Sequence, residues 1–321
     1  MITVNDMIVI LLLGFFCSLA GTWMSIKLAH LWAVHSQAHD RSLHEGRIPR
    51  LAGLGLFAGW IVSLSVAGAI LQDPRLWIAL ACMVLLLSAG LYDDWRSATG
   101  HDNDPTSSLL KFLSQVAAAC LAAGFCYRVE GFQIFGPISI EIGPVTGFFF
   151  TVLWIVALTN FFNFMDGSNG MAGGTAIIMS MFLFYWTQNP SMQWASLLVM
   201  ALGVSVLAFM PFNFPSPRTF MGDGGALVIG FVLALAALPA SQGLVPRHLN
   251  PWQAALIWSP FILDAGITVI RRLLRGDNIF KAHSSHFYQS IIKHGHSHVS
   301  VALLYWNLAV FFNLIAYRLF R

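Results

Sequence analysis

The stretch LWIALACMVLLLSAGLY, residues 76–92, contains no charged side chain and ends directly at Asp93-Asp94-Trp95-Arg96. Its length approaches the roughly 20 apolar residues that an α-helix needs to cross the hydrocarbon core of a bilayer. Comparable apolar stretches extend along the chain in both directions, at about 6–31, 51–71, 109–127, 144–162, 171–188, 191–211, 224–240, 251–274 and 299–320. The pattern predicts an all-α fold, a polytopic membrane protein of about ten transmembrane helices.

The composition agrees with a membrane location. The chain has 321 residues, of which 57% are hydrophobic and 10% charged, and its mean hydropathy is +0.71. So few charged side chains cannot coat a soluble globule of 35.3 kDa. The connections between apolar stretches are short, and the 4 cysteines show no spacing typical of a metal site or a disulfide framework. We therefore expect a single integral-membrane domain over residues 1–321.

The distribution of lysine and arginine predicts the orientation of these helices. Most of the 17 basic residues lie in or beside loops that a count of ten spans places on one side. Basic loops remain cytoplasmic, so both termini are expected outside. The predicted cytoplasmic loops are 32–50, 93–108, 161–170, 212–223 and 275–298.

Two adjacent carboxylates, Asp93 and Asp94, stand where the 76–92 stretch ends. A helix C-terminus already carries partial negative charge, so such a pair is unfavourable unless a cation lies nearby. A divalent metal is the natural cation. The alternative is a solvated pair at the membrane surface, neutralised by Arg96 or a neighbouring lysine.

Two further carboxylates lie among glycines just before an apolar stretch, in Asp166-Gly167-Ser168-Asn169-Gly170 and Gly222-Asp223-Gly224-Gly225. Glycine permits close backbone approach, and free N–H groups at a helix start favour phosphate oxygens. Asp, Asn and Gly are also ordinary capping and turn residues. Carboxylate oxygens suit Mg²⁺, which is commonly shared with substrate phosphates. Three carboxylate sites on one face therefore predict a diphosphate substrate.

The first and last polar loops are basic and contain histidine. Their basic character favours a nucleotide or a phosphate, although orientation alone explains the arginines of the first loop. Alternate histidines without cysteine are a weak zinc signal, so surface histidines are the default interpretation of the last loop. The histidines of that loop are His283, His286, His294, His296 and His298.

Taken together, the motifs of the five loops resemble those of the polyprenyl-phosphate N-acetylhexosamine-1-phosphate transferase superfamily, glycosyltransferase family 4, over nearly the whole chain. No single motif is specific, but all of them in a fixed order are. Members of the family are ten-span proteins with a cytoplasmic active site, which agrees with the count and orientation above. The matching segments are Arg41-Ser42-Leu43-His44, Pro49-Arg50-Leu51-Ala52-Gly53, Asp93-Asp94, Asn163 to Gly167, Phe220-Met221-Gly222-Asp223 and His283-Ser284-Ser285-His286-Phe287-Tyr288-Gln289.

The resemblance implies a reaction and its partners. An N-acetylated sugar-1-phosphate, GlcNAc or a 6-deoxy-N-acetylhexosamine, would pass from a UDP-sugar to undecaprenyl phosphate in the bacterial inner membrane, releasing UMP. The expected cofactor is Mg²⁺, with Mn²⁺ as a substitute. The product would initiate a cell-surface polysaccharide of the O-antigen type. Membrane lipids and a second copy of the chain are further expected partners, and nucleic acid is not.

The resemblance also implies roles for individual residues. The catalytic candidates are Asp93, Asp94 and Asp166, and the metal candidates are Asp223 and Asn163. Lys111 has a second interpretation as an interfacial lysine with its ammonium in the headgroup region. The substrate-binding candidates are Arg47, Lys111, Asn169, Gly222, His283 and His286, with His44 and Asp264 as additional candidates.

Departures from the family pattern bear on the branch and leave alternatives open. Asn169 replaces an aspartate that is usual in the family, and Ser284 replaces a common arginine. The branch that uses a UDP-MurNAc-pentapeptide donor typically has a run of histidines, which His286-Phe287-Tyr288 does not reproduce, so polysaccharide initiation is favoured over peptidoglycan synthesis.

A membrane transporter is the alternative from another functional class, but transporter sites lie near the bilayer centre. Only Asp264 is that deep, within the stretch 251–274. An ionisable residue there is costly and is by default functional or paired.

Overall fold

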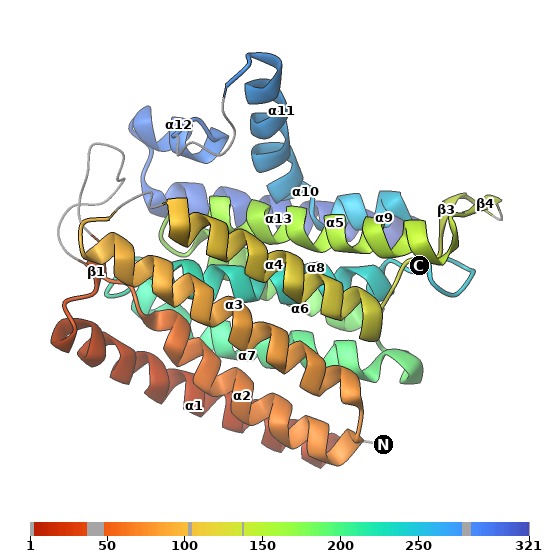
Figure 1. Cartoon of the computed structure of the whole chain (residues 1–321), viewed down its shortest axis with the longest axis horizontal. Coiled ribbons are helices and arrows are strands. Elements are labelled where there is room, and N and C mark those ends of the chain that lie inside the picture. The colour runs from red at the N-terminus through yellow and green to blue at the C-terminus, as the bar shows by residue number, and fades with distance from the viewer. Residues whose placement is uncertain (1–2, 37–47, 102–104, 137, 278–283, 321) are drawn as a thin grey trace.

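The computed structural model describes residues 3–36, 48–101, 105–136, 138–277 and 284–320. Long helices, nearly parallel or antiparallel to one another, form one bundle (Figure 1). In these helices the backbone N–H and C=O groups bond to one another within the helix, which a bilayer requires because its core holds no water. The long helices are α1 (Val4–Leu31), α2 (Ala52–Leu71), α3 (Pro74–Ala98), α4 (Pro105–Phe125), α5 (Gly143–Met165), α6 (Met171–Trp186), α7 (Gln193–Asn213), α8 (Gly222–Ala240) and α13 (His298–Phe320).

Helix α8 forms the centre of the bundle. It packs against α2, α3, α5, α6 and α7, and nearly all of its side chains are buried. Its sequence, GDGGALVIGFVLALAALPA, is rich in glycine and alanine, which lets neighbouring backbones approach closely. At Gly90 of α3, an added Cβ would lie 2.4 Å from Gly224 of α8. The start of α8 is thereby fixed against the end of α3.

The span expected at 251–274 is broken after Ile257. Its parts are α9 (Pro251–Ile257), α10 (Ser259–Phe261), a π-helical turn (Ile262–Gly266) and α11 (Ile267–Leu274). The segments Pro251–Ile257 and Ser259–Leu274 meet at an angle of 74°, and α11 points away from the bundle (Figure 1). The short helix α12 (Phe287–Lys293) follows in the chain.

The two ends of the bundle differ. Both chain termini lie at one end, together with strands β3 (Gly131–Phe135) and β4 (Ile138–Glu141) (Figure 1). These strands pair antiparallel, and β5 (His248–Leu249) pairs parallel with β3. At the opposite end lie α12 and the short antiparallel pair of β1 (His35–Ser36) and β2 (Ile48–Pro49).

The structure confirms the all-α membrane fold that the sequence predicted. Within the described part of the chain, eight helices are long and apolar enough to cross a bilayer, and the bent pair from Pro251 to Leu274 would make a ninth if it is one span. The remaining expected span, 171–188, corresponds to α6, which is apolar but has only 16 residues. The count of ten stays a prediction.

Candidate active site

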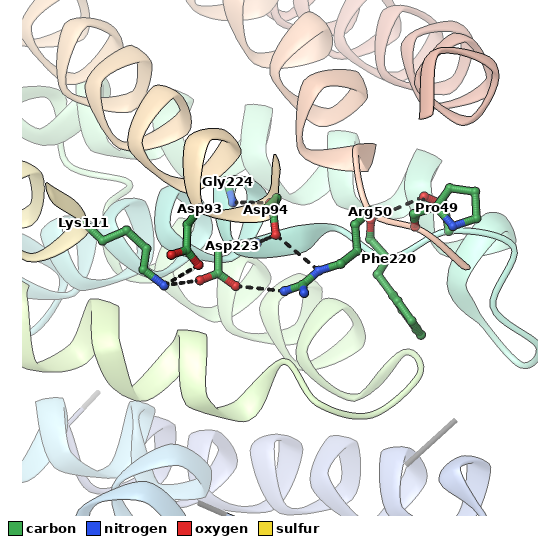
Figure 2. A network of polar contacts seen from close by, with 9 residues as sticks. Pro49, Arg50, Asp93, Asp94, Lys111, Phe220, Asp223 and Gly224 are labelled. Atoms are coloured by element: carbon green, nitrogen blue, oxygen red, sulfur yellow. Dashed lines mark hydrogen bonds and ion pairs between the residues drawn. The ribbon is translucent and has the colours of Figure 1, made fainter. Parts of the chain in front are cut away.

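Two carboxylates from distant parts of the sequence meet at one lysine. Lys111, in the first two turns of α4, places Nζ 2.7 Å from Asp93 Oδ2 and 2.6 Å from Asp223 Oδ2 (Figure 2). Asp93 also accepts a hydrogen bond of 2.6 Å from Ser107 Oγ. All three charged side chains are less than one-fifth exposed. The ends of α3, α4 and α8 therefore bring opposite charges together in a largely dehydrated place, where ion pairs are stronger than in water.

The neighbouring carboxylate, Asp94, holds the start of α8. Its side chain is fully buried and accepts hydrogen bonds from the backbone N–H groups of Asp223, at 3.1 Å, and Gly224, at 3.3 Å. Gly222, before them, has φ of +70°, and a Cβ there would lie 2.4 Å from Asp94 Oδ2. Only glycine fits both requirements. Asp94 thus satisfies helix-terminal donors that would otherwise be unpaired.

Arg50 is the second cation of the cluster. Its Nε lies 3.2 Å from Asp94 Oδ1, and one terminal nitrogen lies 3.2 Å from Asp223 Oδ1 (Figure 2). Burial by itself lowers the pKa of Arg50, but the carboxylates of Asp94 and Asp223 outweigh it and raise that pKa. Both oxygens of Asp223 therefore face protein cations, Lys111 on one side and Arg50 on the other.

The glycine-rich loop after α5 adds a fourth carboxylate. Asp166 is half-buried at the end of α5. Burial raises the pKa of its carboxyl well above the usual range, and the charges of Asp223 and Asp94 act in the same direction, against the effect of Arg50. This environment favours the neutral form of the carboxyl, and a cation entering the cluster would act in the opposite direction, towards the charged form.

A buried amide joins this loop to the loop before α8. Asn213 Oδ1 accepts a hydrogen bond of 2.7 Å from the backbone N–H of Gly170, and Asn213 Nδ2 donates to the carbonyl of Thr219 at 3.0 Å. Asn169, next to Gly170, is buried. The two glycine-rich segments that resembled each other in the sequence are thus connected directly.

The last polar loop reaches the same region through Tyr288. Its hydroxyl donates to the carbonyl of Phe164 at 3.3 Å. The same hydroxyl would lie only 2.0 Å from a Cβ added to Gly167. His286, two residues earlier, packs its ring 6.0 Å from that of Phe164. His286 is therefore placed beside the loop that carries Asp166.

The oxygen donors of the cluster fit a magnesium ion that is shared with substrate phosphates. Asp93 and Asp223 already direct one oxygen each at a single cation position, the one that the Lys111 ammonium takes. Among the described residues, no group of three or more His, Cys, Asp or Glu side chains could hold a metal by itself. Mg²⁺ commonly takes one or two carboxylates and completes its coordination with water and phosphate oxygens.

The structure brings together many of the residues that the sequence singled out. Asp93, Asp94, Lys111, Gly222 and Asp223 are joined by the contacts above. Asn163 is half-buried one turn before Asp166, and its metal-binding role stays a prediction. Three predicted residues lie outside the described part of the chain, namely His44, Arg47 and His283.

Sequence reasoning missed Arg50 and Asn213. It treated the arginines of the first loop as orientation signals and chose Arg47 as the substrate contact. A usable signal was the position of Arg50 inside the Pro49-Arg50-Leu51-Ala52-Gly53 motif. Asn213 offered only a lone amide at the end of an apolar stretch, which does not distinguish it from an ordinary capping residue.

Comparison with known proteins gives one family. The model of glycosyl transferase family 4 matches residues 76–241. Similar proteins include the decaprenyl-phosphate N-acetylglucosaminephosphotransferase of Mycobacterium leprae (strain TN), 25% identical over 83% of this chain and 71% of the relative. The probable undecaprenyl-phosphate N-acetylglucosaminyl 1-phosphate transferase of Bacillus subtilis (strain 168) is 26% identical over 87% and 75%. The undecaprenyl-phosphate alpha-N-acetylglucosaminyl 1-phosphate transferase of Yersinia pestis is 27% identical over 88% and 75%.

Proposed function

Because this chain belongs to glycosyl transferase family 4, we propose that it transfers an N-acetylhexosamine-1-phosphate from a UDP-sugar to undecaprenyl phosphate. The observation that carries the proposal is the cluster of carboxylates bridged by Lys111 and Arg50 at one end of a membrane bundle. The names of the relatives, which use undecaprenyl or decaprenyl phosphate and N-acetylglucosamine, support this substrate class.

The reaction is a phosphoryl transfer between two phosphates. An oxygen of the acceptor phosphate attacks the phosphorus that carries the sugar, and the bond from that phosphorus to the bridging oxygen of UMP breaks. UMP leaves with the electron pair, and the acceptor becomes a lipid diphosphate sugar. The second pKa of a phosphate monoester is near ~6, so the acceptor is already largely dianionic at neutral pH. A protein base therefore contributes little to activating it.

The main task of the protein is then to hold negatively charged groups in line and to stabilise the charge that develops between them. Asp223 and Asp93 would hold Mg²⁺, which supplies positive charge to the phosphate oxygens. Lys111 and Arg50 are fixed cations within reach of the same carboxylates and would contact the diphosphate. Asp94, bonded to two backbone N–H groups of α8, orients Asp223.

The location of the site supports the choice of substrates. The acceptor keeps its isoprenoid chain in the bilayer while its phosphate meets a soluble nucleotide sugar, so both must meet at the end of a helix bundle. We infer from the excess of basic residues at this end that it faces the cytoplasm, in a bacterial inner membrane. Initiation of a cell-surface polysaccharide, with GlcNAc or a 6-deoxy-N-acetylhexosamine as donor, is the fuller form of the proposal.

Release of UMP tests the proposal. The purified full-length chain in detergent would receive undecaprenyl phosphate and a panel of UDP-N-acetylhexosamines, with Mg²⁺, with Mn²⁺ and with EDTA. We expect UMP only when lipid phosphate and metal are both present, and at least a hundredfold less from Asp223→Asn. Asp73→Asn is the matched control, because the same carboxylate-to-amide change then falls at the opposite end of α3, where Asp73 pairs with Arg75. No UMP from any donor, by folded protein that binds lipid phosphate, would refute the proposed chemistry and favour a transporter.

A further inference from the structure

A single buried carboxylate lies in the bent span, after the break between Ile257 and Ser259. Asp264 lies in the π-helical turn (Ile262–Gly266) and is only 2% exposed. Such turns expose backbone groups that a regular helix would satisfy, and they occur frequently at functional sites. An isolated carboxylate at this depth is costly, so what it contacts decides what it does.

Both oxygens of Asp264 bind donors from the chain that follows. Oδ1 accepts from His286 Nδ1 at 3.1 Å and from the backbone N–H of Phe287 at 2.9 Å. Oδ2 accepts from the backbone N–H of Tyr288 at 2.9 Å and from the hydroxyl of Tyr305 in α13. The carboxylate thus connects the first residues of α12 to the π-helical turn and to α13.

The contact with His286 also fixes the state of its ring. A carboxylate only accepts hydrogen bonds, so Nδ1 of His286 must carry a proton. The neutral imidazole is thereby restricted to one of its two tautomers, and the ring is held in one orientation. For histidines that bind a metal, removing the side chain that accepts a hydrogen bond from the second ring nitrogen typically lowers activity by about 10–100-fold.

The fastened segment lies directly against the candidate active site. Tyr288 contacts the carbonyl of Phe164 and the position of Gly167, the two residues that flank Met165-Asp166. The ring of His286 lies 6.0 Å from that of Phe164, tilted by 36°, and His286 is 3% exposed. A displacement at Asp264 would therefore move both the histidine and the loop of Asp166.

We propose that Asp264 is a positioning residue that acts through His286, holding the imidazole and the start of α12 against the loop of Asp166. The inference rests on the proposed function for the role of His286 at the substrate. The simple alternative is that Asp264 only stabilises the π-helical turn of the span. The two differ in whether the effect of losing Asp264 depends on His286.

A double-mutant cycle separates them. The rates of UMP release would be measured for wild type, Asp264→Asn, His286→Gln and the double variant, with Asp73→Asn as the control for a carboxylate-to-amide change. We expect Asp264→Asn to lower kcat by about 10–100-fold with little change in KM, and to cause no further loss once His286 is Gln. The same fold loss in both backgrounds would overturn the proposal, because Asp264 would then act independently of His286.

Two further measurements keep the test valid if folding or the reaction itself fails. Asp264→Glu retains the charge and should recover part of the activity that Asp264→Asn loses. Hydrogen–deuterium exchange needs no turnover, and Asp264→Asn should speed exchange in residues 286–293 while α3 and α8 stay protected. If wild type released no UMP, the proposed function would fail. The exchange measurement would still test whether Asp264 holds residues 286–293 in position. Unchanged exchange in 286–293 would refute it.

Discussion

Replacing Lys111 by Met tests whether its ammonium takes the place of a metal ion in the cluster. Its Nζ lies between Asp93 Oδ2, at 2.7 Å, and Asp223 Oδ2, at 2.6 Å, and its side chain is 19% exposed. Removing one partner of a largely buried ion pair typically costs about 3–5 kcal/mol, because the remaining charge is uncompensated. Arg50 still pairs with Asp223, so we expect a loss near the lower limit, about 3 kcal/mol.

Magnesium should compensate for that loss. A ligand present at 100 times its Kd stabilises the state that binds it by about 2.7 kcal/mol, which nearly matches the expected cost of Lys111→Met. In wild type the metal competes with the ammonium for Asp93 and Asp223, so it should stabilise less. The difference between the two proteins is therefore expected in EDTA and should nearly disappear in Mg²⁺.

Thermal unfolding in detergent provides the assay, followed by the fluorescence of the 11 tryptophans. We expect Lys111→Met to unfold several degrees below wild type in EDTA. Lys111→Arg keeps the charge and should lose less. Lys27→Met is the control, since Lys27 is exposed and lies over Trp23, outside the cluster. Equal midpoints in EDTA, or equal shifts by Mg²⁺ in both proteins, would show that Lys111 does not occupy the metal position.

Three further predictions concern the same cluster. Arg50→Met should lower UMP release at least tenfold and weaken binding of the UDP-sugar, because it removes a guanidinium paired with two carboxylates; unchanged kinetics would exclude Arg50 from substrate binding. Asp166→Asn should abolish activity yet, in EDTA, raise the unfolding midpoint at pH 8 and leave it unchanged near pH 4. The reason is that a raised pKa of Asp166 in the folded protein lowers the free energy of unfolding only at pH values above its pKa in the unfolded chain, about 3.9. The opposite pH trend would contradict this reasoning. Gly222→Ala should destabilise more than Gly100→Ala, since both have positive φ but only the Gly222 Cβ meets neighbours, at 2.4 Å from Asp94; similar unfolding midpoints would refute this packing argument.

The sequence was most informative where a physical requirement acts on a continuous segment. The apolar stretch 76–92 had to form a helix, because a bilayer leaves no other way to satisfy its backbone. The carboxylates at its end were recognisable, since paired charges beside apolar residues need a partner. The sequence therefore identified Asp93, Asp94 and Asp223 as candidate site residues without any knowledge of their contacts.

The sequence was least informative where long-range contacts decide. The stretch 251–274 is mostly apolar, so its composition does not show a 74° bend. The contacts of Asp264 in the same span could not be read from it either, because its partners His286 and Tyr305 are more than twenty residues away. Arg50 could not be preferred over Arg47 for a similar reason, because its partner Asp223 is 173 positions distant.

The burial of α8 limits where new specificity can arise. Asp223 lies at the start of α8, a helix that packs against several others. An insertion or an enlarged side chain there would turn the carboxylate away from Lys111 or push several helices apart at once. Asn169 and His286, although buried, lie outside the long helices, in the loop after α5 and just before the short helix α12. Donor preference should therefore diverge among relatives through these segments, while the end of α8 that carries Asp223 stays unchanged, and inhibitors directed at that end should retain their potency across differing sugar specificities.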